Sequence, residues 1–153
     1  MMKKSGDRMG KKTAIIYISS TGNTEAMAEA VAVGAKANSD KILLAPVSDV
    51  RPEDIAAGYD CIFLGSPAMG IEVIEESQMK PFCEALKPLI VGKRMAVFGS
   101  CGWSRGAWLN AWQQSLKFAG AIFPAKPVLA YGYPDEEAMK NCEELGNIVT
   151  SLK

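Results

Sequence analysis

The sequence predicts an α/β protein built on a doubly wound, five-stranded parallel sheet with helices on both faces. Two observations support this prediction. Short apolar segments alternate with longer segments in which apolar residues recur at three- and four-residue spacing. Turn-forming residues flank the short segments, as at 60–65 (DCIFLG). Such an alternation implies parallel strands joined by right-handed helical crossovers.

Each expected strand is a short apolar segment. The first contains the run at 14–18 (AIIYI), the third is 60–65, and the fourth contains 95–99 (MAVFG). Their brevity, β-branched residues and bounding turn signals favour strands over helices. The last segment, 122–131, is interpreted as one uninterrupted strand. The strands are expected at 12–18, 41–46, 60–65, 93–99 and 122–131.

The expected helices lie between and after these strands. Trp108 and Trp112 belong to an apolar series at helical spacing, so both are expected to pack in the core. The last helix begins at 134–137 (PDEE), where the helix dipole favours acidic residues in the first turn. We expect helices at 23–36, 51–57 (short), 77–88, 106–119 and 135–152.

Length and composition indicate one domain. The chain has 153 residues, of which 48% are hydrophobic and 22% charged, as in ordinary soluble globular proteins. Residues 1–11 are basic and polar and lack the apolar core of a signal peptide. They are expected to form a flexible extension, followed by the domain at 12–153. We expect no membrane helix, because no run of about 18 apolar residues occurs, and no nucleic-acid surface, because Lys and Arg are not clustered.

Histidine is absent and the four cysteines form no C-x-x-C pair. The absence of histidine excludes Ser-His-Asp and Cys-His catalysis. The absence of histidine and of a C-x-x-C pair together argue against a metal site. A reduced, cytoplasmic setting fits best. Cys61 lies in an apolar strand and is expected to be inert, whereas Cys101 lies in a loop and is the one candidate for reactivity.

A hydroxyl-rich loop, SSTGNT, separates the first strand from the first helix. The first backbone N–H groups of a helix have no partners within it, and the helix dipole attracts anions. Such a loop is suited to a phosphate. It has no Lys and no G-x-G-x-x-G pattern, which points to a monophosphate rather than a nucleoside triphosphate or dinucleotide. The expected phosphate-binding residues are Ser19, Ser20, Thr21, Gly22, Asn23 and Thr24.

Two further unusual loops follow strands. One is 66–72 (SPAMGIE), after the third strand, and the other is 100–106 (SCGWSRG), after the fourth. Ligands of open α/β sheets bind outside the carboxyl ends of the strands, at the point where the strand order reverses. If the first, third and fourth strands are adjacent, all three loops converge on one pocket.

These loops resemble those of flavodoxins, most closely the short-chain, clostridial type. The resemblance rests on SSTGNT at 19–24, PAMG-x-E at 67–72 and FGS-x-GW at 98–103 followed by Gly106 and Trp108, and it covers nearly the whole chain from Lys12. It implies a flavodoxin-like strand order of 2-1-3-4-5 and non-covalently bound FMN.

The resemblance also implies roles for individual residues. Loop 19–24 would bind the ribityl phosphate, and Met69 and Trp103 would lie against opposite faces of the flavin. Glu72 would accept a hydrogen bond from flavin N3, and Gly70 would let the adjoining peptide turn over on reduction. No catalytic residue is implied. Besides 19–24, the implied cofactor-binding residues are Ser66, Pro67, Ala68, Met69, Gly70, Ile71, Glu72, Ser100, Cys101, Gly102, Trp103, Gly106 and Trp108.

By the same resemblance, the protein is expected to be a low-potential single-electron carrier whose FMN passes between oxidised, semiquinone and hydroquinone states. It would shuttle electrons between reductases and acceptor oxidoreductases in transient complexes, as a monomer. Glu72, Glu75 and Glu76 would ring its docking face. Arg105 and Ile71 depart from the family pattern. Arg105, if it approaches the pyrimidine edge of the flavin, is expected to raise the hydroquinone potential, and the β-branched Ile71 is expected to stiffen the switching turn and so to affect semiquinone stabilisation.

Two alternatives remain open at this stage. The first is a small FMN-dependent NAD(P)H or quinone reductase, although Met69 and Trp103 covering both flavin faces would leave no room for a second substrate. The second is a regulator of the same fold without flavin, such as a receiver-type domain. A receiver needs acidic residues after the first and third strands, where this chain has Ser19, Ser20 and Ser66.

Overall fold

Five parallel strands form a single sheet in the computed structural model, which describes residues 11–19, 21–68, 74–102 and 106–151. The strands are β2 (Lys11–Tyr17), β3 (Ser39–Pro46), β4 (Cys61–Pro67), β5 (Arg94–Cys101) and β6 (Val128–Tyr131). Their spatial order is β3-β2-β4-β5-β6, and all four neighbouring pairs are parallel. The predicted order 2-1-3-4-5 is therefore confirmed.

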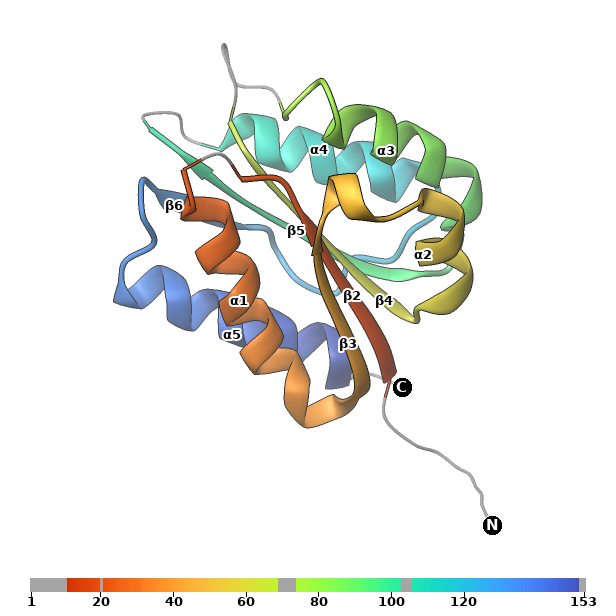
Figure 1. The fold of residues 1–153 in the computed structure, drawn as a ribbon, viewed down its shortest axis with the longest axis horizontal. Helices are drawn as coiled ribbons and strands as arrows, with labels where there is room; N and C mark the ends of the chain where they lie inside the picture. Colours follow the sequence, from red (N-terminus) through yellow and green to blue (C-terminus); the bar gives the residue numbers. More distant parts are fainter. Residues whose placement is uncertain (1–10, 20, 69–73, 103–105, 152–153) are drawn as a thin grey trace.

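Helices cover both faces of this sheet. They are α1 (Asn23–Ala35), α2 (Pro52–Gly58), α3 (Met79–Leu86), α4 (Ala107–Phe118) and α5 (Glu136–Ser151), with short 3₁₀ turns η1 (Lys36–Asn38), η2 (Val47–Asp49) and η3 (Lys87–Leu89). Figure 1 shows α1 and α5 on one face and α2, α3 and α4 on the other. No helix in the described ranges combines the length and the apolar character needed to span a bilayer.

The two faces of the sheet bury two separate apolar cores, because successive strand residues point in opposite directions. Ile15, Phe63 and Phe98 pack with α1 and α5. Their chain neighbours Ile16 and Leu64 pack into the opposite core. The central strands β4 and β5 are buried on both faces, which explains why they are continuous apolar runs rather than alternating ones.

That opposite core also contains Trp108 and Trp112 of α4. Both tryptophans are buried, as their helical spacing predicts. The Trp112 indole N–H also has a partner there, because it donates to the Cys83 sulfur at 3.4 Å.

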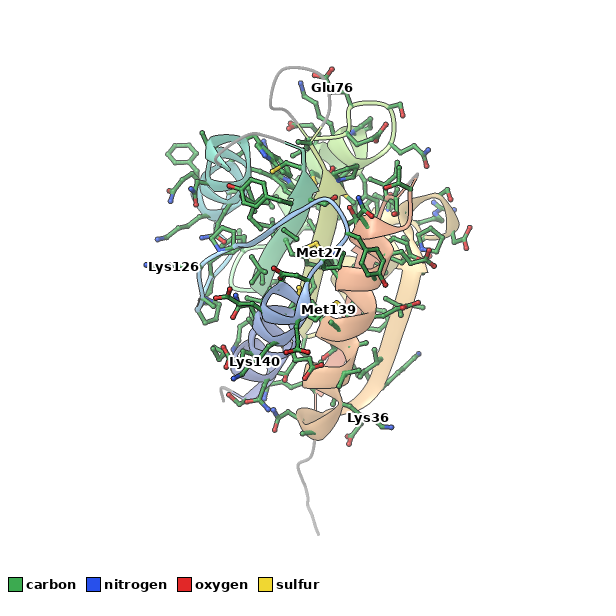
Figure 2. The ribbon with its side chains drawn as sticks, turned by 90° about the vertical axis from the view of Figure 1, so that its left-hand side faces the viewer. Met27, Lys36, Glu76, Lys126, Met139 and Lys140 are labelled. Atoms are coloured by element: carbon green, nitrogen blue, oxygen red, sulfur yellow. The ribbon has the colours of Figure 1, made fainter. Side chains whose placement is uncertain are left out.

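Helices α1 and α5 lie side by side (Figures 1 and 2) and approach closely through two glycines. A Cβ atom on Gly34 would overlap the backbone carbonyl of Glu143, and one on Gly146 would overlap the carbonyl of Val31. Backbone thus packs on backbone here, which fixes the position of α5 along α1.

The prediction of one continuous strand at 122–131 is wrong. Ile122 makes only an isolated bridge to Arg94, and regular pairing starts again at Val128. Pro124 and Pro127 lie between them, and proline has no N–H to donate to a strand ladder. All other helix and strand ends lie within two residues of their predicted positions.

The predicted amino-terminal extension lies outside the described residues except for Lys11. Lys11 is the first residue of β2 and pairs with Ser39. Within the described residues, β2 therefore includes the last residue of the expected extension.

Candidate functional site

The loops that follow β2, β4 and β5 start beside one another at the carboxyl edge of the sheet. Two backbone hydrogen bonds extend the ladders into them. The Ile18 N–H donates to the Gly65 carbonyl at 3.0 Å, and the Ala68 N–H donates to the Ser100 carbonyl at 2.7 Å. The predicted convergence of the three loops is therefore confirmed by the strand order and by these bonds.

The loop between β2 and α1 folds around Ser19. The Gly22 N–H donates to Ser19 Oγ at 3.1 Å, and Gly22 has φ of +92°, a conformation that favours glycine. Gly22 is also the N-cap of α1 and has no side chain with which to occupy the first-turn amides. The start of α1 therefore offers backbone donors and the positive end of a helix dipole to an anion.

Thr24, in the first turn of α1, is held against the end of β5. Its hydroxyl lies 2.9 Å from the Ser100 hydroxyl, and both side chains are buried. This bond crosses over β4 and fixes the start of α1 relative to the loop that follows β5. Sequence reasoning predicted both residues as cofactor ligands. The structure shows them bonded to each other, and direct contact with a cofactor stays a prediction.

Ser66 is fully buried and joins the two ends of the loop after β4. Its hydroxyl donates to the Pro67 carbonyl at 2.9 Å and accepts from the Glu75 N–H at 3.0 Å. Together with the Ala68 bond, this fixes the chain both before and after segment 69–73. Ser66 is a predicted cofactor residue whose observed contacts hold the loop ends.

Glu75 caps α3. Its carboxylate accepts hydrogen bonds from the backbone N–H groups of Gln78 at 2.7 Å, Met79 at 2.8 Å and Ser77 at 2.9 Å, and also from the Ser77 hydroxyl. Burial alone would raise the pKa of this carboxyl group. The hydrogen bonds to its charged form outweigh burial and hold the pKa below its ordinary value of 4.5.

The predicted acidic docking ring is therefore wrong at Glu75, whose carboxylate faces the helix start rather than solvent. Glu76 is exposed and lies 3.8 Å from the Lys80 ammonium. Glu72 lies outside the described residues. Nothing in the sequence distinguishes Glu75 from its acidic neighbours, because its role depends on where α3 begins.

The end of β5 and the start of α4 pack closely. A Cβ on Gly99 would lie 2.5 Å from the Trp108 ring and 2.6 Å from the Ser66 carbonyl oxygen, so glycine lets the indole cover this strand end. Gly106 caps α4 with φ of +83° and is buried, whereas Gly102 is exposed. Trp108 lies in the core, and its predicted contact with a cofactor stays untested.

The thiols of the described chain are all buried. The Cys61 thiol donates to the Val149 carbonyl at 3.8 Å, and burial raises its pKa, in agreement with its predicted core position. Burial also raises the pKa values of Cys83 and Cys142 to about 12. Cys101, the predicted reactive candidate, is itself only 7% exposed.

Sequence reasoning missed two tyrosines at this edge. Tyr131 and Tyr133 are exposed on either side of Gly132, whose N–H donates to the Cys101 carbonyl at 2.9 Å. The signal was present, because YGYP at 131–134 combines a turn-forming glycine with φ of +67° and a proline. Both residues therefore lie close to Cys101, the last residue of β5.

Several predicted site residues cannot be placed. Pro67 and Ala68 are half-buried at the start of the second loop, Thr21 is exposed, and Asn23 is half-buried at the first position of α1. Outside the described residues lie Ser20, Met69, Gly70, Ile71, Glu72, Trp103 and Arg105.

The fold is that of a class, the doubly wound α/β proteins, whose ligands bind where the strand order reverses, and at this edge the start of α1 offers backbone donors to an anion. The donors present fit the phosphate of a mononucleotide, because backbone N–H groups and hydroxyls lie together without a basic side chain in 19–24.

Comparisons with known proteins agree with a mononucleotide-binding α/β fold. The family model described as Flavodoxin matches residues 15–146. The chain is 37% identical to a flavodoxin of Clostridium beijerinckii over 138 residues, which cover 90% of this chain and 99% of that one. It is 39% identical to a flavodoxin of Megasphaera elsdenii over 132 residues, covering 86% and 93%. The solution structure of two-electron reduced Megasphaera elsdenii flavodoxin matches with a TM-score of 0.82 and 36% identity, covering 92% of this chain and 99% of that one.

The chain belongs to the flavodoxin family. Flavodoxins are small FMN-binding proteins that carry electrons to redox partners and are not enzymes. This protein is accordingly an FMN-binding electron carrier, and the reductase alternative is not favoured.

Proposed function

We propose that this protein is a low-potential, one-electron carrier that holds FMN across the carboxyl ends of β2, β4 and β5, with the phosphate at the start of α1. The observation that supports this most directly is the glycine-capped start of α1 beside the two other loops. A helix start without a side-chain cap attracts a phosphate, and neighbouring loops can enclose the attached ring system.

FMN, when bound, supplies the one-electron chemistry. The chain's own residues bind it, orient it and exclude water. The Thr24–Ser100 bond holds the phosphate-binding turn against the loop after β5. Ser66 and Ala68 fix both ends of segment 69–73, in which the family resemblance places Met69 and Glu72 against the flavin.

The protein would meet its reductases and acceptor oxidoreductases at this edge, as a monomer in the cytoplasm. The encounters would be transient and guided by charge. Exposed Glu76 and the exposed rings of Tyr131 and Tyr133 lie on the described part of this rim. Because Glu75 is committed to capping α3, it does not contribute a free charge to docking.

A reductive titration tests the proposal. The purified protein with one equivalent of FMN is reduced stepwise without oxygen, and its visible spectrum is followed. We expect a bound-flavin spectrum and, at partial reduction, the long-wavelength absorption of one-electron-reduced flavin. Direct two-electron reduction with turnover of NAD(P)H would instead indicate a reductase, and failure to bind FMN would refute the proposal.

Riboflavin provides a control for the phosphate site, because it carries the same ring without the phosphate. We expect it to bind much more weakly than FMN. Equal affinity for the two compounds would show that the start of α1 does not hold the phosphate, even if the ring binds.

A further inference from the structure

An exposed apolar patch lies at the amino edge of the sheet, opposite the proposed FMN site. We define it by Leu89, Val91, Phe118 and Ile122, which are 43%, 76%, 96% and 52% exposed. Phe118 is the last residue of α4, and an almost fully solvated phenyl ring gains nothing from folding. Exposed apolar groups scattered singly are normal, but groups gathered in one place mark an interaction site.

Backbone contacts bring together the two chain segments that carry these four side chains. The Gly92 N–H donates to the Gly120 carbonyl at 2.9 Å, and the Ile122 N–H donates to the Lys93 carbonyl at 2.8 Å. The turn before β5 therefore lies along the chain that follows α4. A Cβ on Gly120 would lie 2.9 Å from a methyl group of Val91, so these segments touch.

The remaining two side chains lie on the same two segments. Leu89 is two residues from Val91, and Phe118 is two residues from Gly120. A shallow surface hollow has Lys87 and Phe118 in its lining, which places η3 beside the end of α4. A side chain from a partner could enter this hollow.

Lysine side chains lie beside the amino-edge patch. Residues 85–134 contain no Asp or Glu. Lys87 and Lys117 line the hollow together with Phe118. Lys93 follows Val91 and Gly92 in the chain, and its ammonium group donates to the Tyr59 carbonyl at 2.7 Å. The Lys87 ammonium lies 2.8 Å from the Glu84 carboxylate. A complementary partner would be acidic and would carry apolar side chains.

We propose that the amino-edge patch is a second docking site, which binds an acidic protein segment bearing apolar side chains. Pairing of this patch with itself in a second copy would bring like charges together. Stable membrane anchoring needs a denser basic cluster or a second anchoring signal. The hollow beside Phe118 instead suits a single apolar side chain flanked by carboxylates.

The position of the patch determines what such docking would do. Strand β5, Arg94–Cys101, separates it from the proposed FMN edge, a length of about 23 Å at 3.3 Å per residue. A partner bound at the amino edge would leave the FMN edge uncovered. The patch would therefore tether the carrier near its partners without blocking electron transfer.

Fluorescence anisotropy of a labelled peptide tests the proposal. The probe is an unstructured peptide of glutamates interspersed with leucines, titrated with the FMN-loaded full chain. We expect saturable binding that weakens with salt, and Phe118→Ser should weaken it about tenfold, as loss of one buried aromatic contact predicts. Val33→Ser is the matched control, because Val33 is also exposed (61%) but lies on α1; it should bind like wild type.

Three results would overturn the proposal: no binding of the glutamate–leucine peptide, equal effects of Phe118→Ser and Val33→Ser, or equal binding of a glutamate–serine peptide that lacks apolar side chains. Binding to phosphatidylserine vesicles but not to the peptide would also overturn it, by assigning the patch to a membrane. The FMN spectrum reports the carboxyl edge of the sheet, so it should be the same in Phe118→Ser and Val33→Ser.

Discussion

The buried hydroxyl pair at the proposed FMN site permits a quantitative test. Thr24→Val and Ser100→Ala each remove one hydroxyl and little volume. Thr24 and Ser100 are 1% and 4% exposed, and their oxygens are 2.9 Å apart. Each single substitution leaves the other hydroxyl buried without this partner, which should lower the free energy of unfolding by about 1–3 kcal/mol.

The double substitution should lower the free energy of unfolding by less than the sum of the two single substitutions. Replacing both members of a buried hydrogen bond by apolar groups of similar shape is close to neutral, so we expect a coupling energy of about 1–2 kcal/mol. Urea unfolding of the apoprotein measures this energy. FMN titration of the same four proteins should show weaker binding for each single variant, because the bond holds the phosphate-binding turn in place.

A second Thr–Ser pair serves as a matched control. Thr13 Oγ1 lies 2.8 Å from Ser39 Oγ, between β2 and β3 at the amino edge of the sheet. Thr13→Val with Ser39→Ala should also show coupling in unfolding, yet leave FMN affinity unchanged. Additive effects for Thr24 and Ser100, or equal losses of FMN affinity at both pairs, would refute the reasoning.

Other predictions concern packing, pH and thiol reactivity. Gly146→Ala should destabilise the protein by roughly 2 kcal/mol in urea unfolding, because the new methyl group overlaps the Val31 carbonyl. The cost of relieving this overlap exceeds the gain in helix propensity. Gly58→Ala, which meets no atom within 4 Å, should be neutral or stabilising, and the reverse order would contradict the packing argument. Because the pKa of Glu75 is lowered in the folded state, the contribution of its carboxylate to stability is present above pH 4.5 and is lost as pH falls through the folded-state pKa. The free energies of unfolding of wild type and Glu75→Gln should therefore converge in acid. A difference that stays constant with pH would show that the charge of Glu75 is irrelevant. Burial raises the pKa of Cys83 to about 12, so a thiol reagent should modify it only after denaturation, and rapid labelling of the native protein would argue otherwise.

The sequence was informative wherever a local pattern decides the structure. Strand and helix periodicity predicted the elements, and the SSTGNT loop at 19–24 marked the start of α1 correctly. The break in the last strand is also a local feature, because Pro124 and Pro127 lack the N–H that a strand ladder needs and both are visible in the sequence.

Long-range partners could not be predicted in the same way. Glu75 belongs to an acidic run that looks solvated until the helix that it caps is located in space. Ser100 and Thr24 are 76 residues apart, and no sequence spacing indicates that their hydroxyls meet. Both cases depend on how the strands are ordered and where the loops return, which only the assembled fold determines.

The fixed ends of segment 69–73 have an evolutionary consequence. Ser66 and Ala68 anchor the chain on either side of it through bonds to Glu75 and Ser100, all of which lie outside the segment. Since the proposed function places these five residues against FMN, selection could vary them, and with them the redox behaviour of the protein, while the surrounding sheet stays the same. In this sense the segment is an exchangeable module on a constant frame, and related carriers could diverge in potential without diverging in fold.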